Sequence, residues 1–166
     1  MPNWCEGNIR LRGKRESIIN FLRNELLYTG YPHGLMGATE TGPLNIDDDG
    51  YEIAVSIPKE KQGFAFSCLY IKDTHRNFID QKSFEVYGDD EEITVCIDFF
   101  KAAWAIEPEP YIEKANKYGI DIRIVGFECG MQFMQNIEIV NGELVKNEEI
   151  KFEDWKWQCL MPNMGG

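Results

Sequence analysis

Residues 93–125, ITVCIDFFKAAWAIEPEPYIEKANKYGIDIRIV, carry the pattern that decides the fold. Residues 93–100 bunch β-branched and aromatic side chains, which is typical of a strand. The segment Glu107-Pro108-Glu109-Pro110 then opens a helix, because proline is tolerated in a first turn and glutamate favours the positive end of a helix. Gly119 ends that helix, and the alternation over residues 120–125 predicts a second strand. The stretch therefore predicts a strand, a helix and a strand in succession.

A second unit of the same kind lies near the start of the chain. Residues 8–12 alternate polar and apolar side chains, so Ile9 and Leu11 are expected on one buried face of a strand. Residues 14–28 place apolar side chains at helical spacing and predict an amphipathic helix. Two helices that bury their apolar stripes on one face of an antiparallel sheet predict an α+β fold of ferredoxin-like type.

The chain of 166 residues and 19.2 kDa is expected to form a single domain over residues 1–166. We expect a strand-containing insertion at about residues 30–90, which begins with a long loop rich in glycine, proline and aspartate. A hairpin that turns at Asn141-Gly142 and a tail are expected at about residues 132–166. The last residues, 161–166, are expected to fray.

Acidic side chains dominate the charge of the chain. The net charge is −11 and the isoelectric point is about 4.6, which disfavours direct binding to phosphate backbones and favours a partner protein with a basic surface. An ordinary solvated surface is the alternative explanation for any one acidic cluster. The clustered side chains with which we expect a basic partner to pair are Asp47, Asp48, Asp49, Asp89, Asp90, Glu91 and Glu92.

Tryptophans are the other candidates for a binding face, because aromatic residues are enriched at interface hot spots. Trp155 and Trp157 lie two residues apart, so they would share one face if the segment were a strand. For Trp4 and Trp104 we favour packing in the core. Together with two residues of the second half of the chain, they form the set of candidate pocket residues: Trp4, Trp104, Glu128 and Phe133.

Several kinds of enzyme are disfavoured by the motifs that the sequence lacks. It contains neither a G-x-G-x-x-G segment nor a phosphate-binding P-loop, so we expect no nucleotide cofactor. We also expect no cofactor of any other class. Residues 45–50, NIDDDG, imitate the start of a calcium loop. The twelfth position of that loop is Ser56 rather than the required glutamate, so no calcium site is expected. No histidine has a cysteine or carboxylate at metal-binding spacing, and no metal site is predicted.

One catalytic alternative remains open. His33 and His75 could act as base and acid in a metal-independent ribonuclease, and Arg76 would place a cation beside the developing phosphorane charge. Histidines in exposed loops are the ordinary explanation for both. Cys5 and Cys129 are the candidates for thiol catalysis, but idle thiols are favoured.

The cysteines and the amino-terminal segment bear on the cellular compartment. The five cysteines include no C-x-x-C pair, which favours free thiols and a reducing environment. Residues 1–4 show neither the basic nor the apolar region of a signal peptide, and no apolar run is long enough to span a membrane. We therefore expect a cytoplasmic protein without a membrane partner.

The opening residues 1–13, MPNWCEGNIRLRG, resemble the start of the YubB-like family of phage and plasmid proteins. In the second half, Trp104, a helix, a strand and the motif Glu128-x-Gly130-x-x-Phe133 are similar to the ferredoxin-like carboxyl module of that family. The chain departs from the family pattern at residues 105–107, which precede Pro108, and at Met134, where glycine is expected. The resemblance implies a mobile-element setting and a ferredoxin-like fold, and it implies no enzymatic activity.

These observations predict an acidic, non-enzymatic accessory protein of a phage or mobile element that acts by protein binding. Inhibition of a host defence nuclease, such as a CRISPR effector, is the specific form that we expect, because a negative surface can occupy a basic groove. A small metal-independent ribonuclease acting on structured or guide RNA is the alternative. A third hypothesis is a module that self-associates through a sheet edge, and the oligomeric state is left open.

Overall fold

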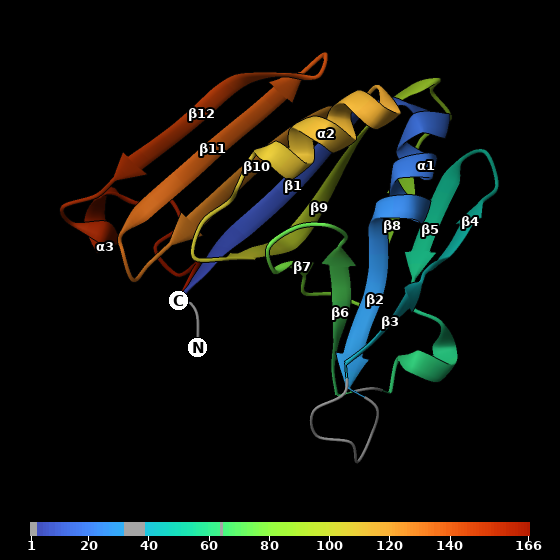
Figure 1. The fold of residues 1–166 in the computed structure, drawn as a ribbon, viewed down its shortest axis with the longest axis horizontal. Helices are drawn as coiled ribbons and strands as arrows, with labels where there is room; N and C mark the ends of the chain where they lie inside the picture. Colours follow the sequence, from blue (N-terminus) through green and yellow to red (C-terminus); the bar gives the residue numbers. More distant parts are fainter. Residues whose placement is uncertain (1–2, 32–38, 64) are drawn as a thin grey trace.

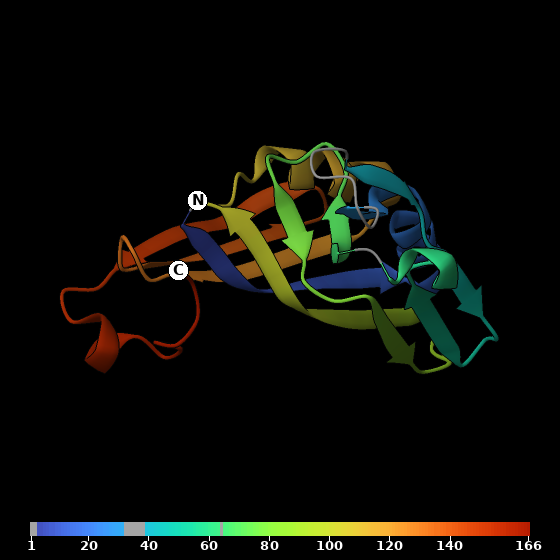
Figure 2. The same ribbon diagram turned by 90° about the horizontal axis from the view of Figure 1, so that it is seen from below.

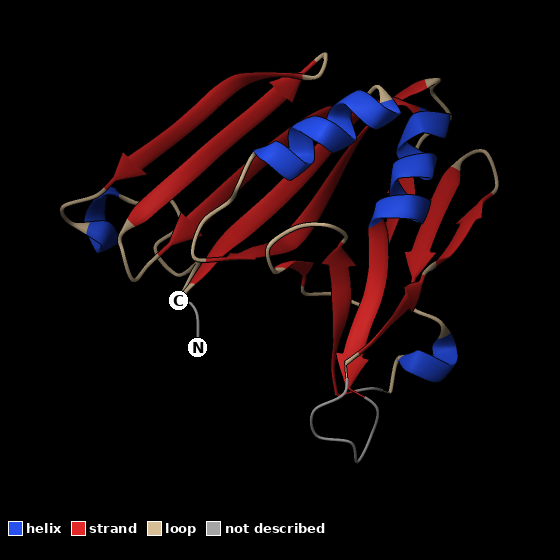
Figure 3. Ribbon diagram, in the orientation of Figure 1, coloured by secondary structure: helices blue, strands red, loops and turns tan. Residues whose placement is uncertain are grey.

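The protein is an α+β structure built on a large antiparallel sheet (Figures 1 and 3). The computed structural model describes residues 3–31, 39–63 and 65–166. The first half of the chain contains β1 (Trp4–Lys14), α1 (Arg15–Glu25), β2 (Leu26–Tyr31), β3 (Glu40–Pro43), β4 (Asn45–Asp48), β5 (Glu52–Ser56), a short 3₁₀ helix (Lys59–Lys61), β6 (Ala65–Ile71) and β7 (Asn77–Ile79). The second half contains β8 (Ser83–Tyr87), β9 (Glu92–Ala103), α2 (Glu109–Tyr118), β10 (Asp121–Glu128), β11 (Phe133–Val140), β12 (Glu143–Lys151) and α3 (Trp155–Gln158).

The main sheet has nine strands in the order β12-β11-β10-β1-β9-β7-β6-β2-β3, and every neighbouring pair is antiparallel. A second sheet of three strands, β4-β5-β8, lies at the end of the molecule that carries α1 (Figure 1). Strands β6 and β7 lie between β9 and β2. The insertion at residues 30–90 therefore adds strands to the main sheet, which is larger than a simple ferredoxin-like sheet.

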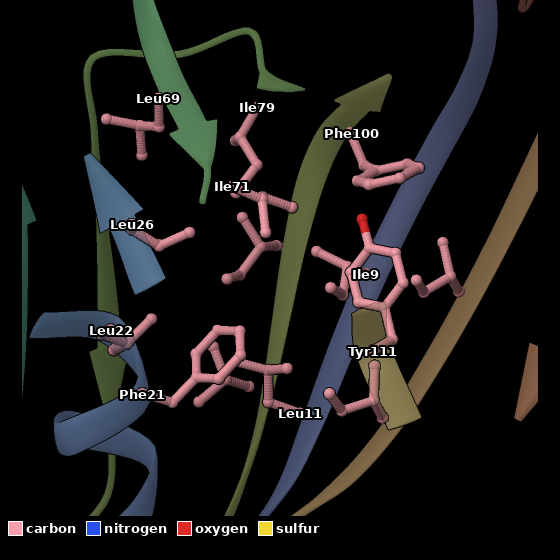
Figure 4. Close-up of a cluster of buried hydrophobic side chains, with 14 of the residues drawn as sticks. Ile9, Leu11, Phe21, Leu22, Leu26, Leu69, Ile71, Ile79, Phe100 and Tyr111 are labelled. Atoms are coloured by element: carbon pink, nitrogen blue, oxygen red, sulfur yellow. The ribbon is translucent and has the colours of Figure 1, made fainter. Parts of the chain in front are cut away.

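Helices α1 and α2 lie on the same face of the main sheet, as Figure 2 shows. On β1, Ile9 and Leu11 are at most 1% exposed, while Arg10 and Arg12 between and beside them are exposed. The predicted alternation of this strand is therefore confirmed. The core beneath the helices is drawn in Figure 4, where Phe21 of α1 lies close to Leu11. Burying such side chains is the main favourable contribution to folding.

The first helix is shorter than its spacing predicts. The helix ends at Glu25, and residues 26–28 belong to β2, where we expected a helix to Tyr28. Pairing explains the difference, because Leu26 lies opposite Ile71 and Tyr28 lies opposite Leu69 of β6. Tertiary pairing overrides a local preference of a few tenths of a kcal/mol per residue, which is about the size of helix propensities. The expected long loop after this helix also contains strands β3 and β4.

The strand, helix and strand predicted for residues 93–125 are confirmed. Helix α2 lies between β9 and β10, and Gly119 ends it in the left-handed conformation with φ of 63°. Asn141 and Gly142 both have positive φ, 51° and 76°, as a tight hairpin turn requires. They join β11 to β12 at the predicted place.

A buried ion pair joins the two helices on the sheet. Glu25 at the end of α1 is 2% exposed, and its carboxylate lies 3.1 Å from the Nζ of Lys114 and 2.8 Å from that of Lys117. Tyr118 donates its hydroxyl to the same carboxylate at 2.6 Å. Burial favours a higher pKa for Glu25, but the hydrogen bonds from Lys117, Tyr118 and Lys114 hold its pKa below the ordinary value.

The carboxyl-terminal residues return to the sheet on the face opposite α1 and α2. There, Phe127, Trp155 and Cys159 form a second, smaller core (Figure 2). Gly166 donates to and accepts from the backbone of Trp4 at 3.2 Å and 3.1 Å. The expectation of a frayed tail is therefore wrong. Within the described part of the chain, no helix has the length and apolar character needed to cross a membrane.

Candidate functional site

Two acidic turns, about forty residues apart in the sequence, meet at the start of α1. Arg15 donates from Nη2 to the carboxylate of Asp48, the last residue of β4 before the β4–β5 turn, at 2.7 Å. The same guanidinium donates to the carbonyl of Gly88 in the β8–β9 turn, and the backbone N–H of Arg15 donates to the carbonyl of Glu91 at 2.8 Å. The Arg15 side chain is only 14% exposed, and its hydrogen bonds join the two turns.

We call the exposed carboxylates of these turns the acidic patch: Asp47, Asp48, Asp49, Asp89, Asp90, Glu91 and Glu92. Arg15 holds the pKa of Asp48 below its ordinary value, and the backbone N–H groups of Glu52 and Tyr51 lower the pKa of Asp49. The cations beside the patch are Lys14, Arg15 and Arg23, which line the same hollow. All seven residues of the patch are exposed, so a partner could reach them from solvent.

The far end of β1 carries a pocket of different chemistry. On the sheet face opposite α1 and α2, Lys101 of β9 lies directly opposite Phe78 of β7, and Phe78 lies opposite Tyr70 of β6. Paired residues of an antiparallel ladder point to the same face, so these side chains form a row. We call the adjoining hollow of 290 Å³ the aromatic pocket; it is lined by Trp4, Thr29, Gly30, Thr39, Cys68, Arg76, Phe78, Asp80 and Lys101.

Two cations lie over the indole rings at this pocket. The guanidinium carbon of Arg76 is 5.6 Å from the ring centroid of Trp4 and 5.8 Å from that of Trp104. The Nζ of Lys101 is 5.3 Å from the Trp4 centroid and 2.5 Å from a carboxylate oxygen of Asp80. In the described part of the chain, Lys101 thus has a carboxylate partner and Arg76 has none.

Comparison of this chain with protein-family models, with curated proteins and with solved structures finds no match. The acidic patch and the aromatic pocket, at the two ends of β1, are the features of the chain that bear on its function.

Trp104 lies beside Arg76, which lines the pocket, rather than in the core. It is 52% exposed, and its backbone has a positive φ of 66°, an uncommon conformation for a residue other than glycine. The ring of His75 lies 5.9 Å from its indole. The expectation of core packing is therefore wrong for Trp104, while Trp4 is half-buried at the pocket. His33, the other histidine of the ribonuclease hypothesis, lies outside the described residues.

The other two candidate pocket residues have structural roles. Glu128 is fully buried, and its carboxylate accepts the backbone N–H groups of Gly130 at 2.7 Å and Met131 at 2.5 Å. Phe133 is 7% exposed and packs in the main core. Neither lines the aromatic pocket. Cys5 is also unsuited to thiol catalysis, because burial and the charges of Glu128 and Glu6 raise its pKa to about 12.

Trp155 and Trp157 do not share a face. They lie on α3, where Asp154 caps the first turn by accepting the N–H of Trp157. Since each helical residue turns the chain by about 100°, two residues apart point to nearly opposite sides. Trp155 is 4% exposed and donates from its indole nitrogen to the carbonyl of Pro162 at 2.9 Å, whereas Trp157 is 86% exposed. The segment is therefore a helix rather than the strand on which the two tryptophans would share a face, and Trp157 alone of this pair is available to a partner.

The calcium-like segment forms an ordinary acidic turn. Residues 45–48 are strand β4, and the Asp49 carboxylate accepts the N–H groups of Tyr51 at 2.9 Å and Glu52 at 2.7 Å. Among residues 3–31, 39–63 and 65–166, no three histidine, cysteine or carboxylate side chains form a group that could hold a metal ion.

Three residues of the aromatic pocket have no sequence signal of their own. Phe78, Asp80 and Lys101 belong to segments that look like ordinary strand or irregular chain. Their meeting depends on the register in which β7 pairs with β9, with Phe78 opposite Lys101. A local pattern does not specify this long-range register. Of the pocket residues, single-residue chemistry could indicate Arg76, which follows His75, and Trp4.

Proposed function

We propose that this chain is a binding protein that docks its acidic patch on a basic surface of a partner protein. The convergence of two acidic turns around Arg15 is the observation that supports this proposal. Exposed carboxylates on turns that are held together can take the places of nucleic-acid phosphates in a basic groove, and complementary charge accelerates the encounter. The fitting partner is therefore a protein that normally binds nucleic acid.

The resemblance to the YubB-like family supplies the biological setting of the proposal. We place the protein in the cytoplasm of a host cell as a non-enzymatic accessory protein of a phage or mobile element. A host defence nuclease, such as a CRISPR effector, is the proposed target. The arrangement of β1-α1-β2 and β9-α2-β10, with β10, β1 and β9 adjacent, supports a ferredoxin-like core into which β6 and β7 are inserted.

Neutralising the acidic patch tests this proposal. In the variant Asp89→Asn/Asp90→Asn/Glu91→Gln, we expect affinity for a partner captured from host lysate to fall at least about tenfold, because three charges leave the contact surface. The matched control Glu107→Gln/Glu109→Gln/Glu113→Gln removes the same charge at exposed positions on or beside α2. Binding of the purified partner, measured by calorimetry at two salt concentrations, compares the two variants.

The control variant is expected to bind within about twofold of the wild type, and raising the salt should weaken wild-type binding. Equal losses in both variants would mean that overall charge, not the acidic patch, attracts the partner. Absence of any partner, together with an unchanged defence phenotype on expression, would remove the proposal.

A metal-independent ribonuclease is the second candidate function. The observation in its favour is that His75 and Arg76 both lie beside Trp104, and that Arg76 also lines the aromatic pocket. With a chelator present, we then expect slow cleavage of structured or guide RNA. The cleavage should disappear in the variant His75→Ala and persist in the control variant Trp157→Ala. Gel analysis of end-labelled RNA measures the cleavage. Intact RNA after prolonged incubation with the wild type would exclude this function.

A further inference from the structure

We propose that the aromatic pocket is a second binding site that holds one nucleotide, with the base against Trp4 and Phe78 and the phosphate on Arg76. This site lies beyond the protein-binding function proposed above, because it uses the opposite end of β1 and a ligand of opposite charge. It does not require cleavage. The chemistry that it recognises is a flat aromatic base joined to an anion.

The apolar wall of the pocket is suited to a base. The rings of Trp4 and Phe78 lie edge to face, with centroids 6.0 Å apart, and Phe78 lies 5.6 Å from Tyr70. All three side chains are half-buried, so they are held by the sheet and still present part of each ring to solvent. Aromatic rings fixed on the face of a sheet form a stacking platform for unpaired bases.

The charges at the pocket make Arg76 the side chain to which an anion would bind. Lys101 is already paired with Asp80, while no carboxylate of the described residues pairs with Arg76. Arg76 is exposed and lies near two indole rings, an arrangement that leaves its guanidinium free to bind phosphate in bidentate fashion. Glu6 lies opposite Lys101 in the β1–β9 ladder, and its carboxylate accepts the N–H of Gly165 at 3.1 Å.

Asp80 adds a preference among bases. Its side chain is 58% exposed and accepts from Lys101, so it retains acceptor capacity toward the pocket that it lines. A carboxylate accepts from the amino groups of adenine, cytosine and guanine, whereas uracil has no amino group and offers only its N3–H. The pocket volume of 290 Å³ lies at the lower end of about 300–1,000 Å³ found for small-molecule sites, which suits a single nucleotide.

The strongly negative net charge does not prevent binding at this site. Strand β1 runs for 11 residues from Trp4 at the pocket to Lys14 beside the acidic patch. At about 3.3 Å per residue the two ends lie about 33 Å apart, while the screening length in physiological salt is about 8 Å. The acidic patch therefore contributes little repulsion at Arg76. Local charges decide binding, and among the described residues that line the pocket Arg76 is the charged one without an ion-pair partner.

Titration of the full chain with labelled single-stranded RNA and DNA octamers, and with CMP, AMP and UMP, tests this site. In fluorescence anisotropy, we expect saturable binding that Arg76→Gln weakens about tenfold, because one charge-assisted phosphate contact is lost. The slope of log affinity against log salt should also become shallower by about 0.7. The matched control Arg23→Gln removes the same charge at the acidic end and should bind as the wild type does.

NMR spectra of the indole N–H groups provide a readout that does not depend on a variant folding. The resonance of Trp4 is expected to shift on titration, while that of the buried Trp155 stays in place. If CMP or AMP binds and the octamers do not, the ligand is a free nucleotide. If the octamers bind and the mononucleotides do not, the ligand is a nucleotide unit within a single strand. Equal affinity for duplexes, equal effects of Arg76→Gln and Arg23→Gln, or an unmoved Trp4 resonance would overturn the proposal.

Discussion

Replacing Glu25 by leucine is expected to lower the free energy of unfolding by about 3–5 kcal/mol, since this change leaves the buried ammonium of Lys114 without a counter-charge. Lys114 is 5% exposed, and its Nζ lies 3.1 Å from the Glu25 carboxylate. The same change removes the acceptor of the Tyr118 hydroxyl. Urea denaturation followed by circular dichroism measures the loss, which is large for a domain of this size.

Two further variants separate the buried charge from a general packing defect. The double variant Glu25→Leu/Lys114→Met removes both ions, and we expect it to recover most of the lost stability. Lys117 also binds Glu25, but its side chain is 59% exposed, so Lys117→Met should cost much less stability than Glu25→Leu. If the double variant is no more stable than Glu25→Leu, the penalty does not come from an unpaired Lys114.

The ion pair also gives the fold a dependence on pH. The pKa of Glu25 lies below its ordinary value of 4.5, so the folded state favours the ionised carboxylate. A carboxyl group of this kind contributes its full stabilisation above its unfolded pKa and loses it as the pH falls through the lower, folded pKa. The wild type should therefore lose stability below about pH 4.5 more steeply than Glu25→Leu/Lys114→Met does.

Local patterns in the sequence predicted elements better than they predicted the sheet. The alternation around Ile9 and Leu11, the helix that ends at Gly119, and the Asn141-Gly142 turn each depend on neighbours in the chain, and each is found in the structure. Strand β2 was missed because residues 26–28 continue a helical spacing. Its pairing with β6, about forty residues later, decides its conformation.

The candidate sites show the same difference between local and long-range information. Charge patterning identified both halves of the acidic patch, but Arg15, which joins them, carried no signal that linked it to Asp48 or Gly88. The sequence suggested Trp4 and His75-Arg76 separately. It could not indicate Phe78 or Lys101, because only the order β1-β9-β7-β6 brings these strands together.

Replacing Trp155 by alanine is the other change with a large expected effect, about 3–5 kcal/mol in the free energy of unfolding. Trp155 is 4% exposed in the second core, where its ring lies 5.5 Å from Phe152 and its indole N–H donates to Pro162. Its loss opens a cavity and leaves the half-buried carbonyl of Pro162 without its donor. Thermal and urea unfolding of the purified variant measure the effect.

Trp157→Ala is the matched control, because it removes the same side chain two residues later. Trp157 is 86% exposed, so this change should alter stability by no more than about 0.5 kcal/mol. A similar loss in both variants would contradict the helical placement of α3, since a shared face requires a shared environment. If Trp157→Ala weakens partner binding while its stability is unchanged, the exposed indole is a contact of its own. Trp155 then acts on binding only by holding α3, and with it Trp157, against the sheet.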